Sequence, residues 1–284
     1  MSEAAVPLPL PREAPPPAPR WRADLALVVA AFFFGTTFLI GGAVLGLLGR
    51  RRPASPGELR DGVAGGAALL AGYVLQTVGL QYTTPSTSAF ITYLLVVFVP
   101  LIGFVALGRR PHPLTLVGLV MAVVGLVLLT GGADASFGKG EVLTMGCAVA
   151  FAAHIVIVGE TAGRHDAIRF TCVQVTTVGL ACLGLSVFTG GLAMPGSAVA
   201  AAAFTGVFAT ALAFWAMVWA QRVVSPSRAA LILLLEPVFA ALLSALAGDP
   251  LTAGALAGGA LILAAVVVAE VMPAYLGGRE AVSH

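Results

Sequence analysis

Charged residues are scarce in this chain. Asp, Glu, Lys and Arg make up 10% of its 284 residues, against about 25% in ordinary soluble domains. Hydrophobic residues make up 59%, and the mean hydropathy is +0.99. This composition excludes an ordinary soluble domain and predicts a membrane protein. The net charge of +2 is too small to predict a nucleic-acid partner.

Cysteines are few, and the common catalytic motifs are absent. Cys147, Cys172 and Cys182 lie in apolar runs without metal-ligand spacing, so we predict no disulfide framework and no metal site. The sequence contains no phosphate-binding loop, no HExxH or GxSxG motif and no paired-acid cluster. We therefore expect no cofactor, no enzymatic activity and no ATP-driven transport by this chain alone.

Long apolar runs recur along the chain after residue 23. About 20 apolar residues cross the hydrocarbon core as a helix, which satisfies its own backbone in lipid. The alternation typical of a membrane β-barrel is missing. We predict an all-α, polytopic membrane helix bundle that follows a disordered, proline-rich tail at 1–22. Nine spans are expected, at 24–48, 62–82, 87–108, 113–131, 140–159, 169–190, 197–220, 228–247 and 251–272.

Arginine residues orient these spans. Eleven Arg residues follow the first, third, fifth, seventh and ninth spans, whereas the opposite loops hold only Lys139. The positive-inside rule makes the Arg side cytoplasmic, including the tail 274–284, and we expect a bacterial cytoplasmic membrane. The resulting alternation of spans across the membrane places the amino terminus outside the cell. The alternative is a first segment that is re-entrant at Gly41-Gly42, with both of its ends inside.

An internal repeat links two distant stretches of the sequence. The stretch "TTPSTSAFITYLLVVFVP" from Thr83 aligns with "VSPSRAALILLLEPVFAA" from Val224, and the spans that follow each stretch also match. The first Pro-Ser lies at an external loop and the second at a cytoplasmic one, so the two copies have opposite orientation. Inverted repeats of this kind are typical of secondary transporters.

Three motifs resemble the EamA-type family of the drug/metabolite transporter superfamily. They are "FFFGTTF" in the first span, "LQTVGLQYTTPSTSAFIT" between the second and third spans, and "SPSRAALILLLEP" in the eighth. The resemblance covers about residues 24 to 272 and implies a ten-helix permease built from two inverted five-helix halves, with both termini cytoplasmic.

The first half departs from the family pattern because it is short. Gly140 to Pro226 is 86 residues, whereas Asp24 to Pro85 is 61, and the difference is about one membrane helix plus a turn. We therefore interpret 24–48 as a fusion of two helices joined near Gly41-Gly42. The expected organisation is a shortened half at 23–131 with four spans and a second half at 132–273 with five.

Glu236 is the one carboxylate deep in a predicted span. Burying a charge there costs several kcal/mol, so the side chain is either protonated for part of its working cycle or faces a wet cavity. Pro237 follows it, lacks an N–H and leaves the carbonyl of Leu233 without a helical donor, which predicts a kink. The pair could serve proton coupling or cation binding. The alternative is a protonated Glu that holds the kink through a hydrogen bond to a neighbouring helix.

Further candidates for the solute path are polar or aromatic groups within spans. His154 could bind substrate, relay protons, or hold two helices together through a hydrogen bond. Tyr73, Gln76, Tyr93 and Trp215 could line a cavity, or could simply be packed.

The small residues in the last span could serve packing within one chain or between two chains. Gly254 and Gly258 form a GxxxG pair, whose default role is packing within the chain, and a homodimer through this face is the other reading.

These features predict a secondary permease or exporter for small metabolites, amino acids or amphiphilic compounds. It would use alternating access around a central cavity, with a small-molecule substrate and the lipid bilayer as its partners. The alternative is a transport-inactive or structural membrane protein derived from such a transporter, because one cavity-forming helix is missing.

Overall fold

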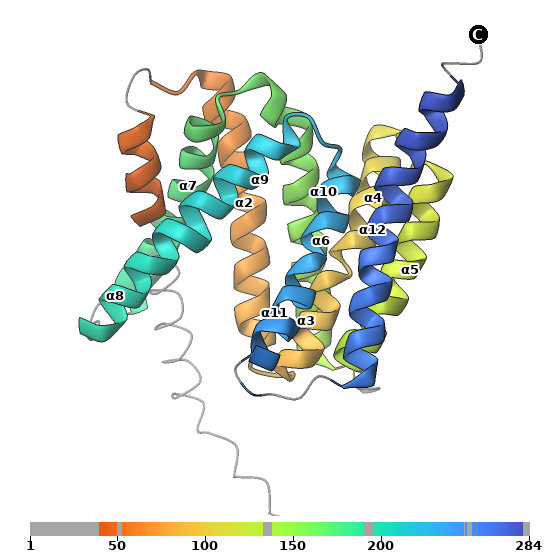
Figure 1. The fold of residues 1–284 in the computed structure, drawn as a ribbon. Coiled ribbons are helices and arrows are strands. Elements are labelled where there is room, and N and C mark those ends of the chain that lie inside the picture. Colours follow the sequence, from red (N-terminus) through yellow and green to blue (C-terminus); the bar gives the residue numbers. More distant parts are fainter. Residues whose placement is uncertain are drawn as a thin grey trace, which may run out of the picture.

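The computed structural model describes residues 40–49, 53–132, 138–189, 196–246, 248 and 252–280. Every regular element within these ranges is helical, which confirms the all-α prediction (Figure 1). The tail at 1–22, most of the first span and the side of the amino terminus lie outside the described residues. The re-entrant alternative for the first segment is outside them too, although 40–48 is one continuous helical stretch.

The helices follow the expected spans closely. They are α2 (Pro56–Gly79), α3 (Pro85–Tyr93), α4 (Leu95–Leu107), α5 (Pro113–Thr130), α6 (Lys139–Thr161), the 3-10 turn η1 (Ala162–Arg164), α7 (Ala167–Thr189), α8 (Gly196–Thr205), the π-helix η2 (Gly206–Leu212), α9 (Ala213–Gln221), α10 (Pro226–Leu233), α11 (Leu235–Leu246) and α12 (Ala253–Glu280).

Seven of the helical stretches described are long and apolar enough to cross a membrane, which makes this a multi-pass membrane protein. Four of them are composite: α3 with α4, α6 with η1, α10 with α11, and the end of α8 with η2 and α9. The apolar part described in α12, Ala253–Ala269, is shorter. The count of nine spans stays a prediction.

The helix α2 begins earlier than the span expected at 62–82. Ser55 caps its start by accepting a hydrogen bond from the Glu58 backbone N–H, and Glu58 in turn accepts from the Ser55 backbone N–H. Pro56 at the first helical position supports the same boundary. The expectation placed Glu58 and Asp61 in a loop because they are charged, but both are buried inside the helix.

Two membrane-crossing stretches are interrupted in the same way. Helix α10 ends at Leu233 and α11 begins at Leu235, so the kink expected beside Pro237 is confirmed as a break at Leu234. The cause is the missing N–H of Pro237, which leaves the Leu233 carbonyl without a helical donor. The break between α3 and α4 at Leu94 was not predicted, because no proline lies within a turn of it.

The helices α5 and α12 form a close antiparallel pair at one side of the bundle (Figure 1). A Cβ at Gly118 would lie 2.7 Å from the Ala269 side chain, and a Cβ at Gly258 would lie 2.4 Å from the Leu129 backbone nitrogen. Only glycine allows these backbones to approach so closely. The glycines of the GxxxG pair therefore pack within the chain, and the homodimer stays a prediction.

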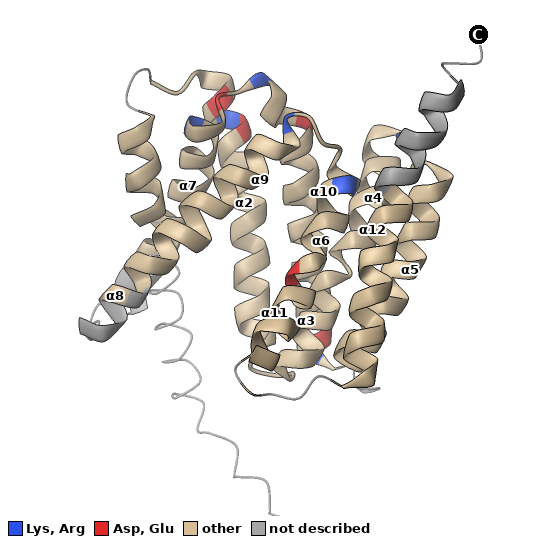
Figure 2. Cartoon of the chain, viewed as in Figure 1, with Lys and Arg blue, Asp and Glu red and all other residues tan. Residues whose placement is uncertain are grey.

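The helix α6 lies at the centre and packs against α2, α3, α4 and α10. The main apolar core surrounds it and includes Val96, Leu126, Ala152, Leu231 and Ile262. Charged residues of the described part of the chain lie mostly at one end of the bundle, where Figure 2 shows Lys and Arg residues gathered. We call this the Arg end; α2 and α7 begin there and α6 finishes there. Lys139, at the first turn of α6, lies at the opposite end.

Candidate functional site

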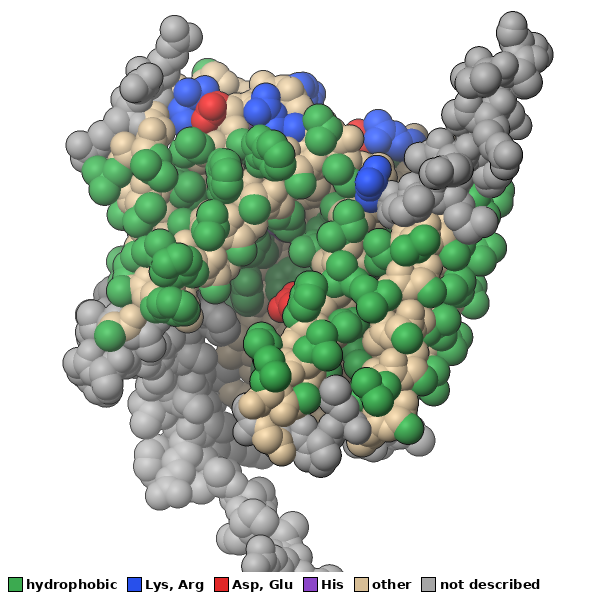
Figure 3. Space-filling model, viewed as in Figure 1, with side chains coloured by type: hydrophobic (Ala, Val, Ile, Leu, Met, Phe, Trp, Pro, Cys, Tyr) green, Lys and Arg blue, Asp and Glu red, His purple; other side chains and the backbone are tan. Residues whose placement is uncertain are grey.

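The site centres on the break between α10 and α11. Glu236 is the acidic residue in the first turn of α11, which lies about halfway along the bundle (Figure 2). Its side chain is exposed rather than packed. Figure 3 shows a hollow in this face of the molecule, between α9 and the α10–α11 pair, with an acidic group on its wall. Glu236 is therefore exposed partway along a membrane-crossing stretch.

Two tyrosines from other helices approach this carboxylate. Tyr93 ends α3 and lies within side-chain range of Glu236, while Tyr73 on α2 is close enough for an electrostatic interaction with it. The Tyr73 ring packs edge-on against Phe151 of α6, with ring centroids 5.3 Å apart. The phenol groups thus supply polar tips next to the acid, on otherwise apolar walls.

A short polar chain lies next to the tyrosines. The Gln76 side-chain amide donates a hydrogen bond of 3.2 Å to the Thr92 hydroxyl. The Thr92 oxygen lies 4.0 Å from the Cys147 sulfur. These contacts join α2, α3 and α6 in the interior of the bundle, where Thr92 and Cys147 are buried. Four sequence-predicted residues, Tyr73, Gln76, Tyr93 and Glu236, thus come from three stretches of the chain to one region.

His154 takes a different position. Its ring nitrogen Nδ1 lies 2.9 Å from the Gly65 carbonyl oxygen, so the side chain links α6 to α2. The residue is 2% exposed, and within the described part of the chain its Nε2 atom has no hydrogen-bond partner. This geometry matches the expected interhelical hydrogen bond, and a role in substrate binding or proton relay stays a prediction.

Trp215, on α9, is partly buried and packs against two apolar clusters, one of which Tyr73 also contacts. It stacks on Trp219, with ring centroids 6.4 Å apart. It also lines an apolar cavity of about 320 Å³ with Val44, Leu45 and Phe208. Trp215 therefore shares an apolar cluster with one of the four residues, Tyr73.

A charged network at the Arg end was missed by the sequence analysis. Glu58 is 2% exposed and accepts hydrogen bonds from the Arg169 Nε atom at 3.1 Å and from the Asp166 backbone at 3.2 Å. Asp61 lies 2.9 Å from the His165 Nε2 atom and 3.6 Å from an Arg164 nitrogen. The network fixes the start of α2 to η1 and α7. The sequence "SPGE" at 55–58 is a helix-capping pattern and could have revealed Glu58, the first residue of this network.

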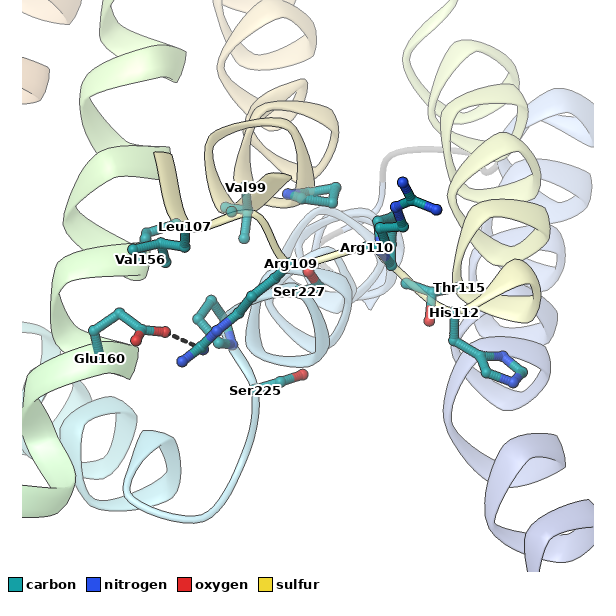
Figure 4. A pocket seen from close by; sticks show the side chains of 14 residues that line it. Val99, Leu107, Arg109, Arg110, His112, Thr115, Val156, Glu160, Ser225 and Ser227 are labelled. Carbon is teal, nitrogen blue, oxygen red and sulfur yellow. Dashed lines mark hydrogen bonds and ion pairs between the residues drawn. The ribbon is translucent and has the colours of Figure 1, made fainter. Parts of the chain in front are cut away.

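A second cavity opens at the Arg end, with a volume of about 270 Å³ (Figure 4). Arg109, in the loop between α4 and α5, pairs with Glu160 near the end of α6. Ser225 and Ser227 contribute hydroxyl groups to its wall, and Val99 and Val156 line its apolar part. This cavity has both polar and apolar walls, and it lies between the α4–α5 loop and the start of α10.

Comparison with known proteins gives one consistent result. The model of the EamA-like transporter family matches residues 23–131 and 138–270. An uncharacterized transporter of Archaeoglobus fulgidus is 30% identical over 266 residues, which cover 88% of this chain and 86% of the relative. A solved crystal structure superimposes with a TM-score of 0.74 at 21% identity, over 88% of this chain and 93% of that one, which shows a shared fold.

Proposed function

This chain belongs to the EamA-like transporter family, and we propose that it is a secondary transporter with its solute site in the hollow beside Glu236. Members of the family are transporters rather than enzymes, and the matched regions cover most of the chain. The proposed substrates are small metabolites, amino acids or amphiphilic compounds. The proposed mechanism is alternating access, in which the hollow opens to one side of the membrane at a time.

One observation carries this proposal: polar side chains converge at mid-depth in an apolar bundle. Tyr73, Gln76, Tyr93 and Glu236 lie on α2, α3 and α11. The two tyrosines pack against the apolar core, whereas Glu236 is exposed. Polar and ionisable groups are costly at membrane depth and usually mark a solute or ion path. A carboxylate flanked by two phenols offers hydrogen bonds to a polar solute and a charge to a cation or proton.

The inverted repeat gives the proposal its mechanical basis. Helix α3 begins after the cap Thr84, and α10 begins after the cap Ser225; each cap accepts a hydrogen bond from the backbone N–H three residues later. Each of these helices is then interrupted by a single residue before its partner continues. The two copies begin at opposite ends of α6, as expected of units with opposite orientation.

The proposed topology follows the Arg residues. We assign the Arg end to the cytoplasm of a bacterial cell and Lys139 to the outer side, by the positive-inside rule. We also assign nine spans, with a first half that lacks about one helix. The family match supports this shortening, because it covers 138–270 in the second half and only 23–131 in the first.

Glu236 is the proposed coupling residue. A bare carboxylate in a membrane-spanning stretch is stable only next to water, a cation or a proton. Its exposure to the hollow gives it access to all three, and Pro237 holds the break in the helix that positions it. Proton exchange or cation binding at this side chain would then drive movement of the solute.

The test is flux through purified protein in liposomes. Amino acids, sugars, nucleosides and cationic drugs are each loaded, and uptake is followed with and without a proton gradient against empty liposomes. We expect at least one class to cross faster than in the empty controls. A well-folded protein that moves none of these classes would instead favour the transport-inactive alternative, which the shortened first half motivates.

A further inference from the structure

Each end of α6 carries a glycine on which a turn between two other helices rests. At the end opposite the Arg end, the α2–α3 turn lies on Gly140. A Cβ there would be 2.7 Å from the Tyr82 carbonyl carbon and 2.8 Å from the Thr83 side chain. The Thr83 hydroxyl also donates a hydrogen bond of 2.5 Å to Glu141. We call this contact the outer seat.

At the Arg end, the α9–α10 turn lies on Gly159. A Cβ there would be 2.5 Å from the Pro226 Cγ atom and 3.4 Å from the Gln221 side-chain nitrogen. Gln221 is 2% exposed and donates a hydrogen bond of 2.9 Å to the Ile155 carbonyl of α6. We call this contact the inner seat.

The two seated turns are equivalent copies of the repeat. The outer seat holds the turn just before Pro85, and the inner seat holds the turn that contains Pro226, which align in the sequence. The hollow lies between α9 and the α10–α11 pair (Figure 3). The α9–α10 turn joins its two helices at the Arg end, whereas α2 and α3 join at the opposite end (Figure 1). Each turn therefore joins its two helices at one end only, and these helices adjoin the site, since α10 leads to Glu236 and α2 and α3 carry Tyr73 and Tyr93.

We propose that the outer and inner seats are the two gates of the transport cycle, with Gly140 and Gly159 as the gating positions. This inference rests on the proposed function and extends it to particular residues. A turn that sits on its glycine holds its helix pair against α6 at that end. When the turn lifts from α6, the hollow opens to that side, while the seat at the other end stays closed.

A methyl group at either glycine separates the turn at that seat from α6 and has no direct effect on the turn at the other seat. Values of 2.5 to 2.7 Å are below any real Cβ contact, and the atoms met are a proline ring at the inner seat and backbone at the outer seat. Neither can move aside as a flexible side chain would, so the turn itself must shift. The same substitution, Gly→Ala, should thus open opposite ends of the protein.

The experiment measures distances between spin labels in the full chain in lipid nanodiscs. One pair, at Val223 and Arg164, reports the inner seat; the other, at Tyr82 and Val142, reports the outer seat. All four positions are exposed. We expect Gly159→Ala to raise the population of the longer distance in the first pair by about tenfold, as expected for overpacking, and to leave the second pair unchanged. Gly140→Ala should do the reverse.

Two controls keep the result interpretable. Gly163→Ala removes a glycine at the Arg end where the new Cβ would make an ordinary contact, 3.8 Å from the Arg222 carbonyl oxygen, so both distances should stay unchanged. Adding Pro226→Ala to Gly159→Ala removes the clashing ring and should restore the original distribution. This second variant tests the inner seat even if Gly159→Ala alone folds poorly.

The gate assignment would be overturned if both variants widened the same pair of labels, or if neither variant widened either pair. An equal effect of Gly163→Ala would also overturn it. The readout requires no substrate. If the seats respond as expected and no solute crosses the liposomes, the proposed function is wrong, but the assignment of the two seats as the contacts that open is supported. Flux without any response of the seats would refute the gates alone.

Discussion

Substitution of Glu58 tests whether the buried network at the Arg end holds α2 in place. Its carboxylate accepts hydrogen bonds from the Ser55 backbone at 3.3 Å, the Asp166 backbone at 3.2 Å and the Arg169 side chain at 3.1 Å. Glu58→Ala removes all three contacts and leaves Arg169 without its carboxylate. Glu58→Gln keeps a shape that can still accept hydrogen bonds but loses the charge.

The size of each effect follows from these contacts. Loss of half of a capping box costs about 1 kcal/mol, loss of the Asp166 backbone hydrogen bond costs about 0.5 kcal/mol or more, and loss of a charge-assisted hydrogen bond costs about 1.5–3 kcal/mol. Arg169 is 28% exposed on its side chain, so water compensates part of that loss and we use the lower value. Glu58→Ala should therefore cost about 3 kcal/mol of unfolding free energy, and Glu58→Gln about 1.5 kcal/mol.

The matched control is Arg60, which pairs with Asp61 but is 77% exposed. An exposed pair contributes at most about 1 kcal/mol, so Arg60→Gln should be close to neutral. The assay is thermal unfolding in detergent, where about 3 kcal/mol corresponds to a fall in Tm of roughly 6–12 °C in a chain of this size. An unchanged Tm for Glu58→Ala, or an equal fall for Arg60→Gln, would refute the reasoning.

Three further predictions address coupling, packing and topology. Glu236→Gln should abolish solute accumulation driven by a pH gradient while the protein still folds, and accumulation with an unchanged pH dependence would disprove proton coupling. Gly258→Leu should lower Tm by roughly 6 °C or more, because even a Cβ there would be 2.4 Å from the Leu129 backbone nitrogen; an unaltered Tm would contradict the α5–α12 contact. A cysteine at Ser2 should react with a membrane-impermeant thiol reagent in intact cells, and labelling only after lysis would place the amino terminus inside.

The sequence predicted features that depend on local chemistry. The break beside Pro237 follows from a missing N–H, so it can be read without tertiary information. The span expected at 228–247 begins two residues earlier, at Pro226, because Ser225 caps the helix there. Glu236 stood out because it is the one acid deep in a predicted span. Its exposure to a hollow depends on how α9, α10 and α11 diverge, which no local pattern encodes.

Features that depend on distant partners were missed. Glu58 and Asp61 were expected in a loop, because their partners on η1 and α7 lie more than 100 residues later and could not be paired in advance. The contact between Gln76 and Thr92 was missed for the same reason, although both residues lie near predicted candidates. The break at Leu94 has no local proline, and its cause is not evident from the sequence.

The pairing of α5 with α12 has a consequence for biosynthesis. Helix α5 ends at Thr130, and α12 begins at Ala253, so the ribosome makes about 120 residues between them. At about 5–20 residues per second, α5 waits roughly 6–25 s in the membrane before its partner exists. During that interval the face carrying Gly118 and Gly125 meets lipid or an insertion chaperone instead of α12. The amino-terminal half is thus not a self-sufficient folding unit, and a ribosome that stalls before residue 253 leaves behind an intermediate that membrane proteases can recognise.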